Sequence, residues 1–335
     1  MRSVNLPEEL QRFVDDRLAD RTATELRRSA GELSARYRAA TASGPAARSA
    51  DDIAAYAATR LPATYAAISM ALDELAGAGF APASQLDLGT GLGSAVWAAG
   101  AAFGDSLQRV TAIDAVDGML ATAAAAAATS AVAVVRRAEW RRADAARTTP
   151  EGPFDLVTAS YLLNELPAAD ALALLSRAWA QTRGAMVLVE PGTPADYDRM
   201  MSFRGHLIEL GATILAPCPH DRPCPMRDDW CHFAVRLPRS AAHRAAKDAK
   251  RGFEDEKFTY VVAVRDPGLV RRGDARILRH PLVRPGHVRF RLCRPDGLAE
   301  VTVARSDPAY RAARKLSWGD RLEPDAHPPI APPHT

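Results

Sequence analysis

The chain has 335 residues and a mass of 36.0 kDa, enough for two domains and a sizeable buried core. Hydrophobic residues make up 47% and charged residues 25%, as in ordinary globular proteins, and no run of 18 apolar residues predicts a membrane-spanning helix. The first residues lack the apolar segment of a signal peptide. We therefore expect a soluble, cytoplasmic protein without a membrane partner.

Charge is unevenly distributed along the chain. The formal net charge is +3, but residues 222–321 hold 23 Lys and Arg against 12 Asp and Glu, a net charge of +11 that leaves −8 for the rest. A basic region joined to an acidic remainder is typical of proteins that bind polyanions, and we expect RNA rather than DNA. A solvated basic surface without a partner is the alternative.

The first part of the chain is expected to be helical. Apolar residues recur at helical spacing, which predicts a helical N-terminal extension over residues 1–78. Small residues and a proline interrupt the pattern near 42–48, and a further helix is expected from about Asp51. Pro62 is expected to kink or divide that helix, because proline removes a backbone donor and clashes with the preceding turn.

From Ser84 onwards, short apolar runs alternate with helical segments. This alternation predicts an α/β domain over residues 79–265, built from βαβ units around a parallel sheet. A cysteine-bearing insertion is expected at about 216–257. The expected strands lie at 85–88, 109–114, 131–136, 154–160, 185–190 and 258–264.

The pattern of polar and apolar residues changes again in the last part of the chain. Three short runs within 276–305 alternate polar and apolar residues, which predicts a small, basic, antiparallel β appendage over residues 266–322. Residues 323–335 are rich in proline and are expected to form a disordered tail.

A glycine-rich turn follows the first expected strand, in Leu86-Asp-Leu-Gly-Thr-Gly-Leu-Gly93. Glycines let a ligand approach the backbone closely, and the next helix presents its N-terminal amides. The turn is shorter than the dinucleotide fingerprint. Its spacing resembles motif I of class I S-adenosylmethionine-dependent methyltransferases. The residues expected to bind the cofactor here are Asp87, Gly89, Thr90, Gly91 and Gly93.

Polar residues follow the later strands in an order that suits a nucleoside. Asp114 ends the second strand, where a carboxylate can accept both hydroxyls of a ribose, and Asp144 follows the third and is expected to face the adenine. Ser160 and Asn164, with Glu165, follow the fourth strand, at the edge where open sheets bind ligands. Each acid alone also suits a helix N-cap or a surface charge. No catalytic group is identified.

The chain contains four cysteines, at Cys218, Cys224, Cys231 and Cys293. Three lie within fourteen residues, and outside a secretory context such a cluster predicts metal binding rather than disulfides. The wide spacing and the neighbouring prolines favour an iron–sulfur cluster with four thiolate ligands. His220 and His232 leave zinc open, and free or disulfide-bonded thiols are a further alternative.

Several motifs together give the sequence a family resemblance over roughly residues 50–321. The chain resembles the mitochondrial small-ribosomal-subunit methyltransferase-like proteins and their bacterial relatives. Besides the glycine-rich turn, the motifs are Tyr161-Leu-Leu-Asn-Glu-Leu166, Leu188-Val-Glu-Pro-Gly192, Ala216-Pro-Cys-Pro-His-Asp221, Trp230-Cys-His-Phe233, Glu254-Asp-Glu-Lys-Phe-Thr-Tyr260, Gly286-His-Val288 and Trp318-Gly-Asp320.

This resemblance implies a seven-strand class I methyltransferase domain that binds S-adenosylmethionine. It also implies a [4Fe–4S] cluster on the four cysteines and association with small-subunit ribosomal RNA during ribosome assembly or translation. Two hypotheses follow. The chain methylates that RNA, or it is a non-catalytic assembly factor that uses the methyltransferase fold as a scaffold.

Overall fold

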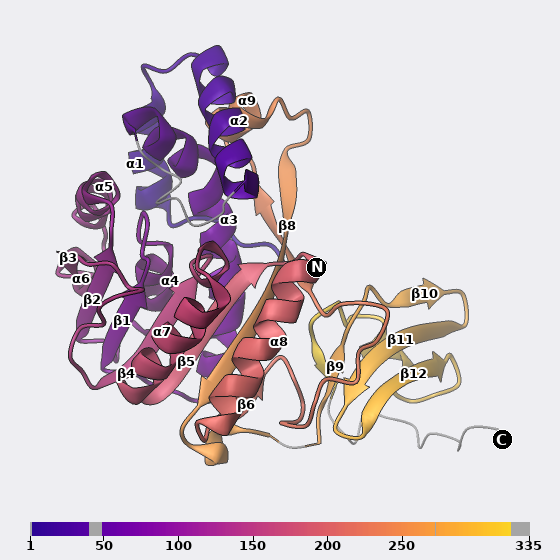
Figure 1. Ribbon diagram of the computed structural model, residues 1–335. Coiled ribbons are helices and arrows are strands. Elements are labelled where there is room, and N and C mark those ends of the chain that lie inside the picture. Colours follow the sequence, from indigo (N-terminus) through magenta and orange to yellow (C-terminus); the bar gives the residue numbers. More distant parts are fainter. Residues whose placement is uncertain (1, 40–48, 272, 323–335) are drawn as a thin grey trace.

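The computed structural model describes residues 2–39, 49–271 and 273–322. Figure 1 shows a central sheet with helices on both faces, and a second, smaller sheet formed by the C-terminal residues at one side. The predicted break near 42–48 and the predicted disordered tail lie outside the described residues. None of the described helices combines the length and apolar character needed to cross a membrane.

The N-terminal residues form three helices, α1 (Glu8–Leu18), α2 (Ala23–Ala39) and α3 (Ala50–Gly77). A capping box begins α3: the Ser49 hydroxyl accepts from the Asp52 amide, and the Asp52 carboxylate accepts from the Ser49 amide. Pro62 does not divide the helix, because α3 continues through it as one helix, and the kink stays a prediction. Most of α3 is buried, and this packing outweighs a local cost of about 3 kcal/mol.

The central sheet has eight strands in the order β3-β2-β1-β4-β5-β8-β6, with β7 paired to β8. Their bounds are β1 (Ser84–Leu88), β2 (Arg109–Asp114), β3 (Glu139–Arg142), β4 (Phe154–Ser160), β5 (Thr182–Pro191), β6 (Thr213–Ala216), β7 (Phe233–Pro238) and β8 (Phe253–Val264). The first five strands in this order are parallel, and β8 runs antiparallel to β5, β6 and β7. This arrangement is the predicted class I methyltransferase fold.

Strand β7 was not expected, whereas β8 contains the strand predicted at 258–264. Strand β8 is twelve residues long, so its second half pairs with β5 and β6 while its first half extends beyond them. This free half pairs with β7, from Phe233 opposite Phe258 to Pro238 opposite Phe253. Part of the cysteine-bearing segment therefore extends the main sheet.

Helices cover both faces of the central sheet, as Figure 1 shows with α7 and α8 in front and α3 and α4 behind. Their bounds are α4 (Ser94–Phe103), α5 (Asp117–Ala127), α6 (Ala133–Arg136), α7 (Ala168–Ala180), α8 (Pro194–Glu209) and α9 (Ala241–Lys247). Neighbouring residues of β5 belong to opposite faces: Leu188 is in the same apolar cluster as Phe203 of α8, and Val187 is in the cluster that contains Leu72 of α3. The alternation places apolar residues on both faces of the strand.

The strand predicted at 131–136 is wrong. Residues Ala133–Arg136 form the short helix α6, and the third strand is Glu139–Arg142. Val134 and Val135 are buried, and the side chain of Val135 lies against Gly100 of α4. A short apolar run is compatible with either a strand or a buried helical turn, and here packing against a neighbouring helix selects the helix.

The predicted antiparallel appendage is confirmed. Its five strands are β9 (Ala275–Ile277), β10 (Leu282–Arg284), β11 (His287–Arg294), β12 (Gly297–Ala304) and β13 (Arg321–Leu322). It has its own apolar core, which includes Phe290 and Leu292 of β11 and Val301 of β12. Three further short helices are α10 (Tyr310–Ala313) in the appendage, η1 (Leu163–Glu165) after β4 and η2 (Pro267–Leu269) after β8.

The order of the strands fixes where a ligand would bind. Sequence order reverses between β1 and β4, which lie side by side. In open α/β sheets, ligands bind beyond the carboxyl ends of the strands at such a reversal. The glycine-rich turn after β1 and the segment after β4 meet at this point.

Candidate functional site

The glycine-rich turn has a left-handed backbone that only glycine adopts readily. The φ angles of Gly89, Gly91 and Gly93 are 62°, 53° and 82°. Thr90 is buried, and its amide donates to the carbonyl of Ile113, which ties the turn to β2. The turn is therefore held rigidly between β1 and the start of α4.

Side chains from later elements pack directly against these glycines. A Cβ added at Gly89 would lie 2.7 Å from Leu162 Cδ1, and one added at Gly93 would lie 2.8 Å from the Trp140 ring. Leu162 follows β4 and Trp140 lies on β3. Any side chain at these two positions would displace a packed neighbour, so close packing within the chain also requires glycine here.

Asp114 joins the glycine-rich turn to the end of β2. One oxygen of its carboxylate accepts from the Gly91 amide at 2.8 Å, and the other accepts from the Val116 amide at 2.9 Å. Burial raises the pKa of Asp114, although both hydrogen bonds oppose this. A carboxylate has about four acceptor positions, so both oxygens keep capacity for a further donor.

The segment after β4 is fixed by a buried carboxyl group. Glu190, at the end of β5, is 1% exposed, and its Oε1 accepts from the Leu163 amide at 2.8 Å. Burial raises the pKa of Glu190 to about 8. Within the described part of the chain, neither Glu190 Oε2 nor Asn164 Oδ1 has a hydrogen-bond partner. Buried polar atoms of this kind indicate a place for water or a polar ligand.

Helix α3 contributes a tyrosine to the same edge. A Cβ added at Gly91 would lie 3.2 Å from the Tyr56 hydroxyl. Burial raises the pKa of Tyr56 to about 12, with Glu165 and Asp114 adding to the effect. Burial also raises the pKa of Glu165 to about 7, and the charge of Asp114 contributes. These groups thus form one partly buried, acidic cluster beside the glycine-rich turn.

The other predicted residues lie around this cluster in different environments. Asp87 is 1% exposed and accepts from the Thr158 hydroxyl at 2.7 Å, and burial raises its pKa to about 6. Asp144 is half exposed, accepts from the Ala146 amide and pairs with Arg147. Ser160 is the last residue of β4. The adenine contact expected of Asp144 stays a prediction.

The residue after β4 has an unusual backbone. Tyr161 has a φ of 55°, which is rare for a residue other than glycine and often marks a functional site. Its hydroxyl donates to Glu256 of β8 at 2.8 Å. This bond links the end of β4 to β8.

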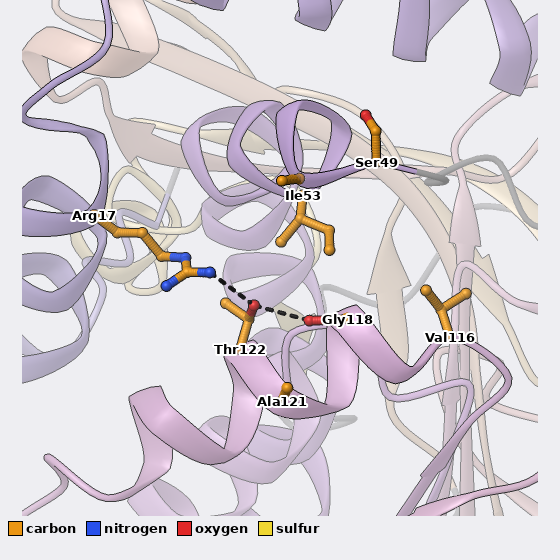
Figure 2. Close-up of a pocket in the computed structure, with 8 residues that line it drawn as sticks. Arg17, Ser49, Ile53, Val116, Gly118, Ala121 and Thr122 are labelled. Carbon is orange, nitrogen blue, oxygen red and sulfur yellow. Dashed lines mark hydrogen bonds between the residues drawn. The ribbon is translucent and has the colours of Figure 1, made fainter.

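A cavity of about 510 Å³ lies beside the residues that follow Asp114. Figure 2 shows Arg17 reaching from α1 toward Thr122 of α5, with Ile53 of α3 and Val116 also on the wall. The Arg17 guanidinium donates to the Thr122 hydroxyl at 3.4 Å. The N-terminal helices thus cover the outer side of the β2–α5 connection.

The four cysteines, three from the loop between β6 and β7 and one from β11, line one cavity. Cys218 follows β6, Cys224 and Cys231 precede β7, and Cys293 lies on β11. All four are free thiols. Burial raises the pKa of the Cys218 thiol, which the Arg204 guanidinium opposes, and burial raises the pKa of Cys293 to about 12. In the described ranges, no three His, Cys, Asp or Glu side chains are arranged to hold a single metal ion.

A few polar groups reach these thiols. The Tyr197 hydroxyl of α8 donates to Cys224 Sγ at 3.2 Å, and His220 Nε2 lies 3.8 Å from Cys293 Sγ. His220 Nδ1 lies 3.2 Å from the Arg222 carbonyl, which can only accept. The thiols therefore lie in a largely apolar cluster, with Met226 and Leu278, into which a few polar groups reach.

Many basic residues of the C-terminal third are bound within the chain. The ion pairs are Arg236 with Asp255, Arg239 and Lys247 with Glu254, Arg276 and Arg321 with Glu74, and Arg279 and Arg291 with Asp229. In contrast, Arg284 of β10, Arg289 of β11 and Arg305 after β12 are exposed. Arg244 of α9 and the following Lys250 and Arg251 are exposed as well, so accessible basic residues lie both on the appendage and at the end of α9.

Several residues of both sites were not predicted from the sequence. Glu190 ends a strand, as Asp114 does, so its position was a usable signal. Tyr56 and Trp140 gave no signal, because an aromatic residue in a helix or strand usually belongs to the core. Tyr197 was likewise hidden in the apolar pattern of its helix.

Comparison with known proteins identifies the relatives of this chain. The human protein "Ribosome assembly protein METTL17, mitochondrial" is 31% identical over 297 residues, which cover 82% of this chain and 64% of that protein. The fission yeast (Schizosaccharomyces pombe) "Rsm22-cox11 tandem protein 2, mitochondrial" is 29% identical over 219 residues, 50% of this chain and 29% of that protein. The chain thus spans less than two thirds of either relative.

Among solved structures, magnesium protoporphyrin IX methyltransferase from Synechocystis PCC 6803 with bound S-adenosylmethionine has a TM-score of 0.40. It is 15% identical, over 61% of this chain and 80% of that one.

The predicted cytoplasmic location is contradicted by these comparisons, because the relatives and the matching family are all described as mitochondrial. The family described as "Mitochondrial small ribosomal subunit Rsm22" matches residues 50–323, which include both the glycine-rich turn and all four cysteines. The resemblance read from the motifs is confirmed, and the chain belongs to the Rsm22 family.

Proposed function

We propose that the chain binds S-adenosylmethionine and a [4Fe–4S] cluster and acts on small-subunit ribosomal RNA in ribosome assembly or translation. The observation that carries the proposal is that the family match spans both the carboxyl-edge site and the cysteine cavity. The human relative is named a ribosome assembly protein, which supports the ribosomal part.

The residues at the carboxyl edge of the sheet fit S-adenosylmethionine. Asp114 would accept the ribose hydroxyls, because its oxygens keep free acceptor positions beside the Gly91 and Val116 amides. The turn from Gly89 to Gly93 would hold the methionine portion, and Asn164 would offer its buried oxygen to a donor. When bound, the cofactor supplies a methyl group already activated on its sulfonium.

The cysteine cavity fits an iron–sulfur cluster by its donor set. Its four thiols are free and converge from one loop and a strand up to 75 positions apart. The Arg204 and Arg276 guanidinium groups oppose the rise in the Cys218 pKa and would balance thiolate charge. A cluster here would fasten the loop that carries Cys224 to β11 of the appendage, which is a structural role.

RNA binding is supported by the exposed arginines of the appendage. Arg284 and Arg289 lie on the neighbouring strands β10 and β11, and both are exposed. Phosphate groups are bound by arginine through paired, charge-assisted hydrogen bonds. We expect this surface to hold the RNA backbone, with little dependence on base sequence.

A non-catalytic assembly factor is the second candidate, and one packing feature favours it. Leu162 lies against Gly89, and the hydroxyl of the preceding residue, Tyr161, donates a hydrogen bond to Glu256. The residues after β4 thus serve internal contacts. In a methyltransferase, orientation of the acceptor is the main catalytic contribution expected of this segment.

One experiment separates the two candidates. RNA crosslinked to the chain in cells is identified, and the same RNA is mapped for modifications in a deletion strain. Crosslinks together with the disappearance of a methyl mark support the enzyme, and crosslinks with every mark retained support the assembly factor. Failure to recover small-subunit RNA would contradict both.

A further inference from the structure

The cysteine cavity contains one well-placed proton donor, which lies outside the cysteine-bearing loop. Tyr197 belongs to the first turns of α8, and its amide donates to the Thr193 carbonyl as in any helix. Its side chain is 6% exposed and crosses to the cavity, where its hydroxyl lies 3.2 Å from Cys224 Sγ. A phenol is protonated at neutral pH and donates its hydroxyl hydrogen.

The surroundings hold this contact in place. Trp230 Nε1 donates to the Gly192 carbonyl at 2.9 Å, which ties the cysteine loop to the turn that precedes α8. Asp229 pairs with Arg279 and Arg291 at 2.7 and 2.8 Å, which ties the same loop to the appendage. The loop and α8 therefore cannot separate easily, and the hydroxyl stays in reach of the sulfur.

We propose that Tyr197 is a positioning residue whose hydroxyl hydrogen-bonds to the Cys224 thiolate of the iron–sulfur cluster and raises the reduction potential of that cluster. The inference rests on the proposed function. Reduction adds negative charge to the cluster sulfurs, and a donor at one of them stabilises the more negative state. A neutral thiol is a weak acceptor, so the bond strengthens when Cys224 is a thiolate.

The test is a redox titration of anaerobically purified protein, followed by electron paramagnetic resonance and visible absorbance. Tyr197→Phe removes the donor and keeps the ring. We expect reduction to become about tenfold less favourable, a negative shift of about 59 mV for a one-electron couple, with iron content unchanged. Tyr260→Phe is the matched control: Tyr260 lines the same cavity, but its hydroxyl donates to Glu74 at 3.3 Å.

The outcomes are distinct. A potential that stays at the wild-type value in Tyr197→Phe, or that shifts equally in Tyr260→Phe, overturns the inference and leaves the cluster intact. Wild-type protein without iron and sulfide overturns the cluster and the inference together. If Tyr197→Phe does not load a cluster, 3-fluorotyrosine at position 197 keeps the shape and makes a stronger donor. It should shift the potential in the positive direction, and a negative shift or none contradicts the inference.

Discussion

Glu74 on α3 and Arg276 on β9 form a buried ion pair, with Arg276 Nη1 2.6 Å from Glu74 Oε1. Arg321 of β13 binds the other oxygen of Glu74 at 2.7 Å, and Arg276 also donates to the Pro217 carbonyl. One carboxylate therefore joins the N-terminal helices, the start of the cysteine loop and the C-terminal sheet. The appendage is fastened to the main domain by charge as well as by apolar contact.

Glu74→Gln should destabilise the fold by about 3–5 kcal/mol, because it leaves the charge of Arg276 buried without compensation. Arg276 is 3% exposed. Denaturant unfolding measures the change in stability. Glu139→Gln is the control, since Glu139 pairs with Arg141 at the surface and should cost at most about 1 kcal/mol. Equal effects of the two substitutions would contradict the stabilising role of the Glu74–Arg276 ion pair.

The same pair predicts acid sensitivity. Burial favours the neutral carboxyl, but Arg276 and Arg321 outweigh it and lower the pKa of Glu74 to about 2, from 4.5 in a free side chain. A lowered pKa stabilises the fold above the unfolded value, and this contribution is lost as pH falls from about 4.5 to 2. Unfolding free energy measured across this range should fall less steeply in Glu74→Gln than in the wild type. Parallel curves would contradict the assignment.

Glu190 predicts a pH dependence of opposite sign. Its pKa is raised to about 8, from 4.5, by burial, so the folded state holds a proton that the unfolded state has lost between these values. Stability should therefore decline as pH rises from about 5 to 8. Glu190→Gln mimics the neutral carboxyl and should flatten that decline, as measured by unfolding at several pH values. Glu151→Gln, at an exposed position, should leave the decline unchanged.

Asp114→Asn should weaken S-adenosylmethionine binding by about tenfold to a hundredfold, because a charge-assisted hydrogen bond contributes about 1.5–3 kcal/mol. Calorimetry on cluster-loaded protein measures the affinity, and thermal unfolding checks the fold. Asp117→Asn is the control, since Asp117 is three residues away and its exposed side chain pairs with Arg142. Wild-type affinity in Asp114→Asn would contradict the assignment of Asp114 to the binding site for S-adenosylmethionine.

Replacing Cys293 by alanine should reduce the iron content from about four atoms per chain and weaken the attachment of the appendage. Metal and sulfide analysis measures the first effect, and limited proteolysis near β11 the second. Thr259→Ala is the control, because Thr259 lines the same cavity without a thiol. One zinc per chain with no sulfide would overturn the cluster in favour of zinc.

Arg284→Glu combined with Arg289→Glu should weaken RNA binding and make its dependence on salt shallower, by roughly one unit of slope for each phosphate that these arginines neutralise. Both side chains are exposed, so the fold should be unaffected. Arg12→Glu on α1 introduces a charge reversal at an exposed position far along the chain and serves as the control. RNA affinity that does not vary with ionic strength would contradict phosphate binding by this surface and favour a solvated basic surface without a partner.

The sequence by itself determined the class of the fold and the sheet edge at which the candidate site lies. The apolar runs of β1, β2, β4 and β5 are bounded by turns, and their order with the helices admits little besides a parallel sheet. Once the strands are parallel, their carboxyl ends meet, so Asp114 and the glycine-rich turn had to be neighbours. This is local information, because each strand and turn is encoded within a few residues.

Only the tertiary structure decided what depends on contacts between distant segments. The apolar run at 131–136 became helix α6 because it packs on α4, and Pro62 stayed inside α3 because burial outweighed its local cost. The meeting of Cys293 with the other thiols, the Tyr197–Cys224 contact and the pairing of Glu74 with Arg276 likewise join residues 27 to 202 positions apart. No local pattern encodes such pairs, since they arise when separate elements are buried against one another.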